Sequence, residues 1–273
     1  MLKKNGLWIV ADDLGLDKKI DEGIFFAAKH NLINGISIVP NGLNFNQASL
    51  KLKDLKNTDL GIHLTLVEES SILAKEAIPS LIGKNGRFYK DHRIFFIRYI
   101  LSLIDLDQIK KEFDAQINRC LVIGLEPSFL NSHQHLHLLP GIRDILIELA
   151  KKYKIQYIRT VTEPIGIKGG MFRKFQLIFL RLLSKRAKNK IISSGLYCND
   201  FFVGFINAGN LSKNDVAYAR KLSQKYPDKL VELGCHPGFI DQNLRPRYAS
   251  WGNYHWQEEI EILQRFKYEN NLS

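Results

Sequence analysis

Short apolar runs alternate along this chain with longer segments that carry apolar side chains at helical spacing. The runs are typical of strands buried on both faces, and they occupy residues 7–11, 35–40, 60–66, 157–160 and 230–238. The segments with helical spacing include residues 45–55, 93–104, 106–121, 141–152, 171–190, 214–226 and 258–266. Strands that alternate with helices predict a parallel sheet with helical crossovers. No repeat or linker divides the sequence, so we expect one domain over residues 1–273.

Three histidines, His133, His135 and His137, alternate with other residues in the segment 131–137, which follows the apolar pair at 129–130. Alternate residues of a β-strand share one face, so this spacing predicts a strand with three imidazoles in a row. Neutral imidazole is the commonest metal ligand among protein side chains. Three bulky polar groups on one face need either solvent or a shared partner. We interpret the run as part of a metal or catalytic site, and histidines on a wet strand edge are the alternative.

Polar side chains also mark the ends of other predicted strands: Asp12, Asp13, His63, Arg159 and His236. Two adjacent carboxylates after a buried strand are unusual, because capping the next helix needs only one of them. His63 stands among apolar neighbours, where a core histidine with satisfied hydrogen bonds is the simpler interpretation. The ends of parallel strands meet on one face of a closed or nearly closed barrel. We therefore expect these side chains to converge on one site.

The residue types at these strand ends suit metal-assisted hydrolysis. One carboxylate and two imidazoles form a three-ligand site with open positions for water. A bound metal ion lowers the pKa of that water and polarises a carbonyl or phosphoryl oxygen. A second carboxylate can accept the proton of the water, and a histidine opposite can protonate the leaving atom. Residue spacing leaves amides, esters and phosphoesters open as substrates.

Amino-acid composition indicates the cellular compartment in which this chemistry takes place. The 273 residues are 45 % hydrophobic, which is enough for a full core. Three scattered cysteines, Cys120, Cys198 and Cys235, form neither a disulfide framework nor a zinc-finger spacing, which favours a reducing compartment. No secretory signal precedes the first strand, and no apolar run is long enough to span a bilayer. We therefore expect a cytoplasmic protein.

Much of the net charge of +11 gathers in the segment 171–190. This segment has seven basic residues, no acidic residue, and apolar residues at helical spacing. It predicts a basic amphipathic helix of the type that lies on anionic membranes, and a core helix with a solvated basic face is the alternative. No nucleic-acid-binding motif accompanies the charge, so we expect no nucleic-acid partner. A scaffold or binding protein that uses this charge is a competing interpretation.

Four segments of the sequence resemble motifs of the YdjC-like carbohydrate deacetylases. They are ADDLG at 11–15, GIHLT at 61–65, NSHQHLH at 131–137 and ELGCHPG at 232–238. Segments 159–164 and 199–204 also look like parts of that family, and the latter is an apolar-aromatic stretch suited to walling a pocket. The resemblance implies an α/β fold, a distorted (β/α) TIM-like barrel with its site at the C-terminal ends of parallel strands. It also implies metal-dependent removal of N-acetyl groups from amino sugars.

The same resemblance assigns the metal ligands. Asp13, His63 and His133 match the residues that bind one divalent metal ion in the family, and Mg²⁺ and Zn²⁺ are both compatible with them. The histidine run leaves one choice open, because His135 is the alternative ligand to His133.

Catalytic roles also follow from the resemblance. Asp12 matches the general base, His236 the general acid, and Arg159 the residue that orients the base. For Arg159, a surface salt bridge is the alternative. The family often has aspartate at the position of Asn131, which weakens any role for that residue as an acid.

Members of the family act on chito-oligosaccharides or on sugars carried by hopanoid or polyprenyl lipids. The basic amphipathic segment 171–190 favours a lipid-carried N-acetylhexosamine, presented at the inner face of an anionic membrane. Soluble chito-oligosaccharides are the alternative substrate. A metallo-phosphoesterase or esterase on the same barrel is the alternative reaction, and the sequence leaves a homodimer open.

Overall fold

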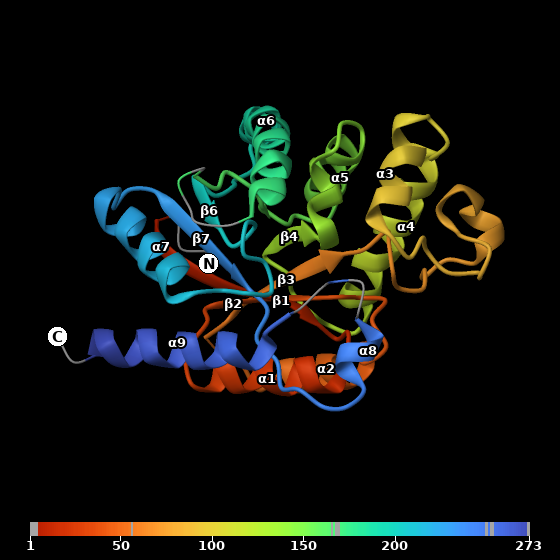
Figure 1. The fold of residues 1–273 in the computed structure, drawn as a ribbon. Helices are drawn as coiled ribbons and strands as arrows, with labels where there is room; N and C mark the ends of the chain where they lie inside the picture. Colours follow the sequence, from red (N-terminus) through yellow and green to blue (C-terminus); the bar gives the residue numbers. More distant parts are fainter. Residues whose placement is uncertain are drawn as a thin grey trace.

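In the part of the chain that the structure describes, seven parallel strands form the centre of the molecule (Figure 1). The computed structural model describes residues 5–55, 57–164, 166, 170–248, 251 and 254–271. The strands are β1 (Gly6–Leu14), β2 (Gly35–Ile38), β3 (Asp59–Leu64), β4 (Phe129–Ser132), β5 (Tyr157–Ile158), β6 (Phe201–Val203) and β7 (Leu230–Cys235). They follow the order β5-β4-β3-β2-β1-β7-β6, and every neighbouring pair is parallel.

Helices link successive strands, and the apolar side chains that they turn toward the sheet form the main core with it. They are α1 (Lys18–Lys29), α2 (Phe45–Leu52), α3 (His92–Ile100), α4 (Leu106–Val122), α5 (Ile142–Lys152), α6 (Met171–Ser193), α7 (Lys213–Lys225), α8 (Leu244–Arg247) and α9 (Trp256–Asn271). The short 3-10 helices include η1 (Lys75–Ala77), η2 (Pro79–Leu81) and η3 (His133–Leu138). Figure 1 shows α3, α4, α5 and α6 along one side of the sheet and α1, α2 and α9 along the other. No helix in the described part of the chain is long and apolar enough to cross a membrane.

Local sequence explains where several helices begin. The side chains of Asp17, Asp91 and Asp105 each accept the backbone N–H two residues further on, at 2.8 Å in all three cases. Ser212 and Asp215 form a capping box at the start of α7. These contacts satisfy N–H groups that have no partner within the first turn of a helix.

The sheet curls until its two edges approach each other. β5 at one edge forms an isolated parallel bridge with Tyr197, in the segment that leads into β6 at the other edge. Ile158 donates its N–H to the carbonyl of Tyr197 at 3.0 Å, and Tyr197 donates to Gln156 at 2.8 Å. Oδ1 of Asn199 accepts the N–H of Thr160 at 2.7 Å. The predicted distorted (β/α) barrel with parallel strands is therefore confirmed.

Alternation along the strands places an apolar layer and a polar layer inside the barrel. Trp8, Phe129 and Tyr157 lie on three different strands and pack edge to face, with Trp8 centroid distances of 4.8 Å and 5.2 Å. Two residues beyond Phe129 and Tyr157 lie Asn131 and Arg159. Residues i and i+2 of a strand share a face, so the polar side chains point into the barrel like the aromatic ones. The aromatic layer forms the bottom of the barrel interior, and the polar layer lies next to it toward the carboxyl ends of the strands.

The histidine run departs from the strand that its spacing predicts. β4 ends at Ser132, and the run continues as the 3-10 helix η3. Gln134 and His135 adopt left-handed backbone conformations, with φ of 54° and 53°, which turn the chain out of the strand direction. The prediction of three imidazoles on one strand face is therefore wrong. The sequence also does not predict β6, because three residues are too few to show an alternating pattern.

Candidate metal centre and active-site cavity

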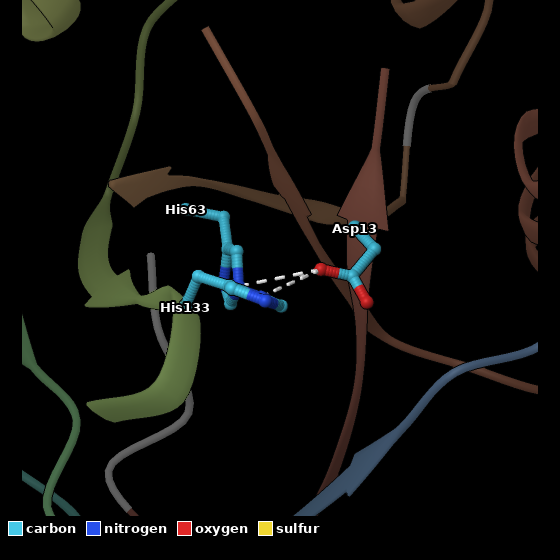
Figure 2. A group of neighbouring side chains, drawn as sticks. All are labelled: Asp13, His63 and His133. Atoms are coloured by element: carbon cyan, nitrogen blue, oxygen red, sulfur yellow. Dashed lines mark hydrogen bonds and ion pairs between the residues drawn. The ribbon is translucent and has the colours of Figure 1, made fainter. Parts of the chain in front are cut away.

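Three side chains meet at the carboxyl ends of the strands (Figure 2). Asp13 belongs to β1, His63 belongs to β3, and His133 follows β4 at the start of η3. Oδ1 of Asp13 lies 3.4 Å from Nε2 of His63 and 3.6 Å from Nδ1 of His133. The two imidazole nitrogens are 3.4 Å apart. The structure thus brings together the three residues that the resemblance implies as ligands, and His135 lies outside this group.

A local irregularity of β1 lets two adjacent aspartates face the same site. In a regular strand, neighbouring side chains point to opposite faces. The pairing of β1 with β2 shifts between Ala11 and Leu14, and Asp13 has a φ of 74°. That left-handed conformation is uncommon outside glycine, although aspartate tolerates it better than branched residues do. As a result, Asp12 lines the cavity while Asp13 reaches the two histidines.

Asn131 fixes the orientation of His63. Nδ2 of Asn131 donates to Oδ1 of Asp12 at 3.0 Å, and its Oδ1 lies 2.8 Å from Nδ1 of His63. Because that amide oxygen can only accept, the proton of His63 must lie on Nδ1. Nε2 of His63 therefore carries its lone pair toward Asp13. Burial lowers the pKa of His63, which keeps the ring neutral and able to bind a metal ion.

Glu68 contacts His133 on the other ring nitrogen. Its Oε2 lies 3.2 Å from Nε2 of His133, and it accepts a hydrogen bond from Nε1 of Trp251. Burial disfavours a charged imidazole here, but contacts with Asp13 and Glu68 outweigh it and raise the pKa of His133 to about 10. The centre therefore gathers negative charge that attracts a cation, either a proton on His133 or a metal ion that replaces it.

The donor set fits a divalent metal ion. Oδ1 of Asp13 is buried and has no hydrogen-bond partner among the described residues, which is a costly state for a carboxylate oxygen. Ligand atoms of Asp13, His63 and His133 all lie within 4.8 Å of one another. One carboxylate and two imidazoles leave coordination positions open for water and substrate.

Asp12 is held beside the metal centre as a carboxylate. Its Oδ1 accepts hydrogen bonds from Ser37 at 2.6 Å, Asn131 at 3.0 Å and Arg159 at 3.0 Å. Its Oδ2 accepts a hydrogen bond from Nη1 of Arg159. Burial opposes a charge at this position, but Arg159 and His63 outweigh it and hold the pKa of Asp12 far below its usual range. Oδ2 has one donor among the described residues, which leaves a lone pair for a water molecule.

Arg159 is buried between two carboxylates. Its Nη1 and Nη2 both donate to Asp12, and its Nε donates to Oε1 of Glu232 at 2.5 Å. Tyr157 donates to the other oxygen of Glu232 at 2.6 Å. The alternative of a surface salt bridge is therefore wrong, because Arg159 is fully buried. The sequence places Glu232 in a motif but assigns it no role, although an acidic residue inside the apolar strand β7 was an available signal.

His236 lines the same cavity from the end of β7. Its backbone N–H donates to Oε2 of Glu259 at 2.5 Å, which ties the strand end to α9. Its ring centroid lies 5.4 Å from that of Tyr254. Nδ1 of His236 is buried without a hydrogen-bond partner among the described residues. Such a nitrogen can exchange a proton with a substrate atom in the cavity.

The cavity has a volume of about 470 Å³, within the range of small-molecule sites. Phe202 and Gly204 form part of its wall, as the apolar-aromatic segment 199–204 predicts. Glu68, Trp251 and Arg173 also line it, and sequence analysis missed their contribution to the site. They lie in loops and on α6, away from the strand ends where spacing gives a signal.

The other two histidines of the run have different surroundings. Nδ1 of His137 accepts a hydrogen bond from Ser132 at 2.7 Å, and its Nε2 donates to the carbonyl of Arg159 at 2.9 Å. Burial lowers the pKa of His137 to about 3, so the ring is neutral and structural. His135 lines the cavity, with its ring 5.8 Å from that of Phe202.

Comparisons with known proteins cover nearly the whole chain. The family model described as YdjC-like protein matches residues 6–272. A carbohydrate deacetylase from Oceanobacillus iheyensis is 30 % identical over 262 residues, covering 93 % of this chain and 94 % of the relative. A carbohydrate deacetylase from Xenopus laevis is 28 % identical over 261 residues, with coverage of 85 % and 81 %.

Two further comparisons concern oligosaccharides and the fold. A chitooligosaccharide deacetylase from Yersinia pestis is 25 % identical over 239 residues, with coverage of 87 % and 83 %. A crystal structure from Enterococcus faecalis, named for cellobiose-phosphate cleavage, superposes with a TM-score of 0.73 at 22 % identity. The superposition covers 96 % of this chain and 91 % of the Enterococcus faecalis chain, and it shows similarity of fold alone.

Proposed function

This chain belongs to the YdjC-like protein family, and on that premise we propose that it is a metal-dependent carbohydrate N-deacetylase. The observation that carries the proposal is the cluster of Asp13, His63 and His133 in one site with Asp12 and His236. Several relatives across most of the chain are named carbohydrate deacetylase, which supports this reaction over others.

Asp13, His63 and His133 would hold one divalent metal ion through one oxygen and two nitrogens. Mg²⁺ and Zn²⁺ are the candidates, and either supplies Lewis acidity toward the acetamide carbonyl and the attacking water. Asn131 and Glu68 orient the two imidazoles from their other ring nitrogens. Such supporting contacts commonly change metal affinity when they are removed.

The remaining groups move protons during hydrolysis of the acetamide. Water adds to the carbonyl carbon and gives a proton to Oδ2 of Asp12, which Arg159 keeps ionised and oriented. The C–N bond then breaks, and His236 delivers a proton to the departing nitrogen. The products are acetic acid and the amine of the sugar, which ionise together to acetate and an ammonium group. The proton that Asp12 accepted returns to His236, so atoms and charge balance without a further reactant.

The proposed substrate is an N-acetylhexosamine carried by a lipid at the inner membrane surface. α6 exposes Phe172 (72 %), Phe175 (65 %) and Leu182 (60 %), so this apolar stripe faces outward and not into the core. Lys174 and Lys185 lie on the same helix. An exposed apolar face with neighbouring basic residues suits an anionic bilayer. Soluble chito-oligosaccharides are the second candidate, which the name of the Yersinia pestis relative favours.

Measurement of released acetate tests the reaction. N-acetylglucosamine, chitobiose and lipid-linked N-acetylglucosamine are each incubated with enzyme treated with chelator, before and after Mg²⁺ or Zn²⁺ is restored. We expect metal-dependent release by the wild type, a loss of at least 100-fold in Asp12→Asn, and no change in the exposed control Lys111→Gln. Turnover of p-nitrophenyl phosphate without any acetate release would overturn the proposal in favour of a phosphoesterase.

A further inference from the structure

A second cavity, of about 260 Å³, adjoins the catalytic one. It lies between α3 and α6, where the rings of Phe96 and Phe179 meet edge to face with centroids 6.0 Å apart. Its apolar lining includes Phe96, Ile97, Leu139, Phe179, Leu180 and Leu183. The two cavities share the lining residues His92, Gln134, His135, Arg173 and Phe205. A ligand in the catalytic cavity can therefore extend into an apolar groove.

Arg173 stands where the two cavities meet. Its guanidinium lies 4.3 Å from the ring centroid of Phe205, donates to the carbonyl of Phe205 at 2.6 Å, and approaches Oε1 of Gln176 at 3.4 Å. A guanidinium has five N–H donors, so these contacts leave donors without a protein acceptor in the described part of the chain. Burial lowers the pKa of Arg173, and the charges of Tyr254 and Glu163 act against that effect. No carboxylate of the described residues lies within salt-bridge distance of its guanidinium, so its contact with Glu163 is a longer-range one.

A half-buried guanidinium that is held in place, has donors to spare and forms no direct ion pair favours an anionic ligand. The planar fork of a guanidinium matches phosphate oxygens in pairs. The apolar groove continues outward to Ile97 and Phe179, whose side chains are 57 % and 47 % exposed. The polar catalytic cavity, the guanidinium of Arg173 and the apolar groove therefore follow one another in this order.

We infer that Arg173 binds the phosphate of a substrate whose amino sugar occupies the catalytic cavity and whose hydrocarbon chain lies between α3 and α6. The inference rests on the proposed function and specifies its substrate as a sugar joined to a lipid through phosphate. The groove is assigned to that hydrocarbon chain, because it leads directly from the sugar site past the cation.

Calorimetric binding of simple probes tests this assignment without turnover. The probes are decyl phosphate, decyl glucoside and inorganic phosphate, each below any micelle-forming concentration. The variants are Arg173→Gln, Phe179→Ser in the groove, and Arg186→Gln as the control. Arg186 is an exposed basic residue of the same helix and lines neither cavity.

We expect decyl phosphate to bind the wild type at least tenfold more tightly than either other probe. Arg173→Gln should remove at least tenfold of that affinity and leave decyl glucoside unchanged, while Phe179→Ser weakens both alkyl probes. Equal binding of decyl phosphate to wild type and Arg173→Gln, or an equal loss in Arg186→Gln, would overturn the inference. Retained decyl phosphate binding through Arg173 without acetate release from any sugar would refute the proposed reaction and leave this anion site standing.

Discussion

Oδ1 of Asn131 and Nδ1 of His63 lie 2.8 Å apart, and this contact decides which nitrogen of His63 faces Asp13. The amide of Asn131 acts in both directions, because its Nδ2 also donates to Asp12 at 3.0 Å. One side chain therefore supports a proposed metal ligand and the proposed base. Neither aspartate nor leucine at this position can make both contacts, since a carboxylate lacks the donor and leucine lacks both groups.

Substitutions of Asn131 should separate these two contributions. Asn131→Ala removes the acceptor of His63, so we expect metal affinity to fall about 10- to 100-fold. Asn131→Asp keeps an acceptor for His63 but places a second negative charge beside Asp12, so metal affinity should hold within a few-fold while acetate release falls. Metal titration and acetate release, measured on the same preparations, check both expectations. Equal metal affinity in Asn131→Ala and the wild type would contradict the assignment.

Removal of Arg159 should destabilise the fold as well as the reaction. Its guanidinium is fully buried and neutralises both Asp12 and Glu232. Arg159→Met leaves two buried carboxylates without a counter-charge, so we expect the free energy of unfolding to fall by about 3–5 kcal/mol. Urea unfolding monitored by circular dichroism measures this change.

A second substitution tests whether unpaired charge is the cause. In Arg159→Met combined with Glu232→Gln, Asp12 is the one carboxylate of this pair that stays buried without a counter-charge. The double variant should recover part of the lost unfolding free energy, because neighbouring sites are not additive. A double variant that is less stable than Arg159→Met would contradict the electrostatic explanation.

The arrangement of strands was predictable because buried strands and amphipathic helices leave strong periodic patterns. Polar residues at the ends of such strands, including Asp12, His63 and His236, were therefore found from sequence and do line one cavity. The path of the histidine run was not predictable. Alternation is the signal of a strand, but Gln134 and His135 adopt left-handed conformations that no residue pattern here indicates.

Contacts made by loops and long-range partners also left no pattern in the sequence. Glu68 reaches His133 from a loop 65 residues away, and Trp251 reaches Glu68 from a segment 183 residues away. Their positions follow from tertiary packing, which a single sequence does not display. Arg173 illustrates the same limit, because its charge is visible in the basic segment but its place between two cavities is not.

His137 should make the fold sensitive to mild acid. Its pKa falls from 6.5 to about 3 on folding, because the buried ring is held neutral between Ser132 and the carbonyl of Arg159. The unfolded chain therefore binds a proton below pH 6.5 that the folded chain does not, so stability falls as pH falls from 6.5 toward 3. Between pH 7 and pH 5 this group alone contributes a loss of about 2 kcal/mol.

The variant His137→Gln isolates that contribution. Glutamine is neutral throughout, so the variant should lose about 2 kcal/mol less unfolding free energy than the wild type between pH 7 and pH 5. Urea unfolding at both pH values, with chelator present to remove metal effects, makes the comparison. Parallel losses in the two proteins would show that His137 is not held neutral by the fold.

The exposed face of α6 should contact anionic membranes mainly through its phenylalanines. Phe172 and Phe175 lie near the start of the helix and are largely exposed, and burying one phenylalanine contributes about 1.5–3 kcal/mol. Phe172→Ser combined with Phe175→Ser should therefore weaken binding to vesicles that contain anionic lipid by at least tenfold. Lys174→Gln combined with Lys185→Gln should weaken binding less and reduce its dependence on salt.

Sedimentation with vesicles of phosphatidylglycerol and phosphatidylcholine measures both effects. The control is Val122→Ser with Ile123→Ser, which removes exposed apolar side chains at the end of α4. If the exposed face of α6 contacts the membrane, this control should keep full vesicle binding, because its substitutions remove apolar surface from the end of α4 and leave α6 intact. Equal losses in the control and the phenylalanine variant would mean that binding reflects general hydrophobicity. Acetate release from soluble chitobiose should be unchanged in all three variants, since none of these side chains lines the catalytic cavity.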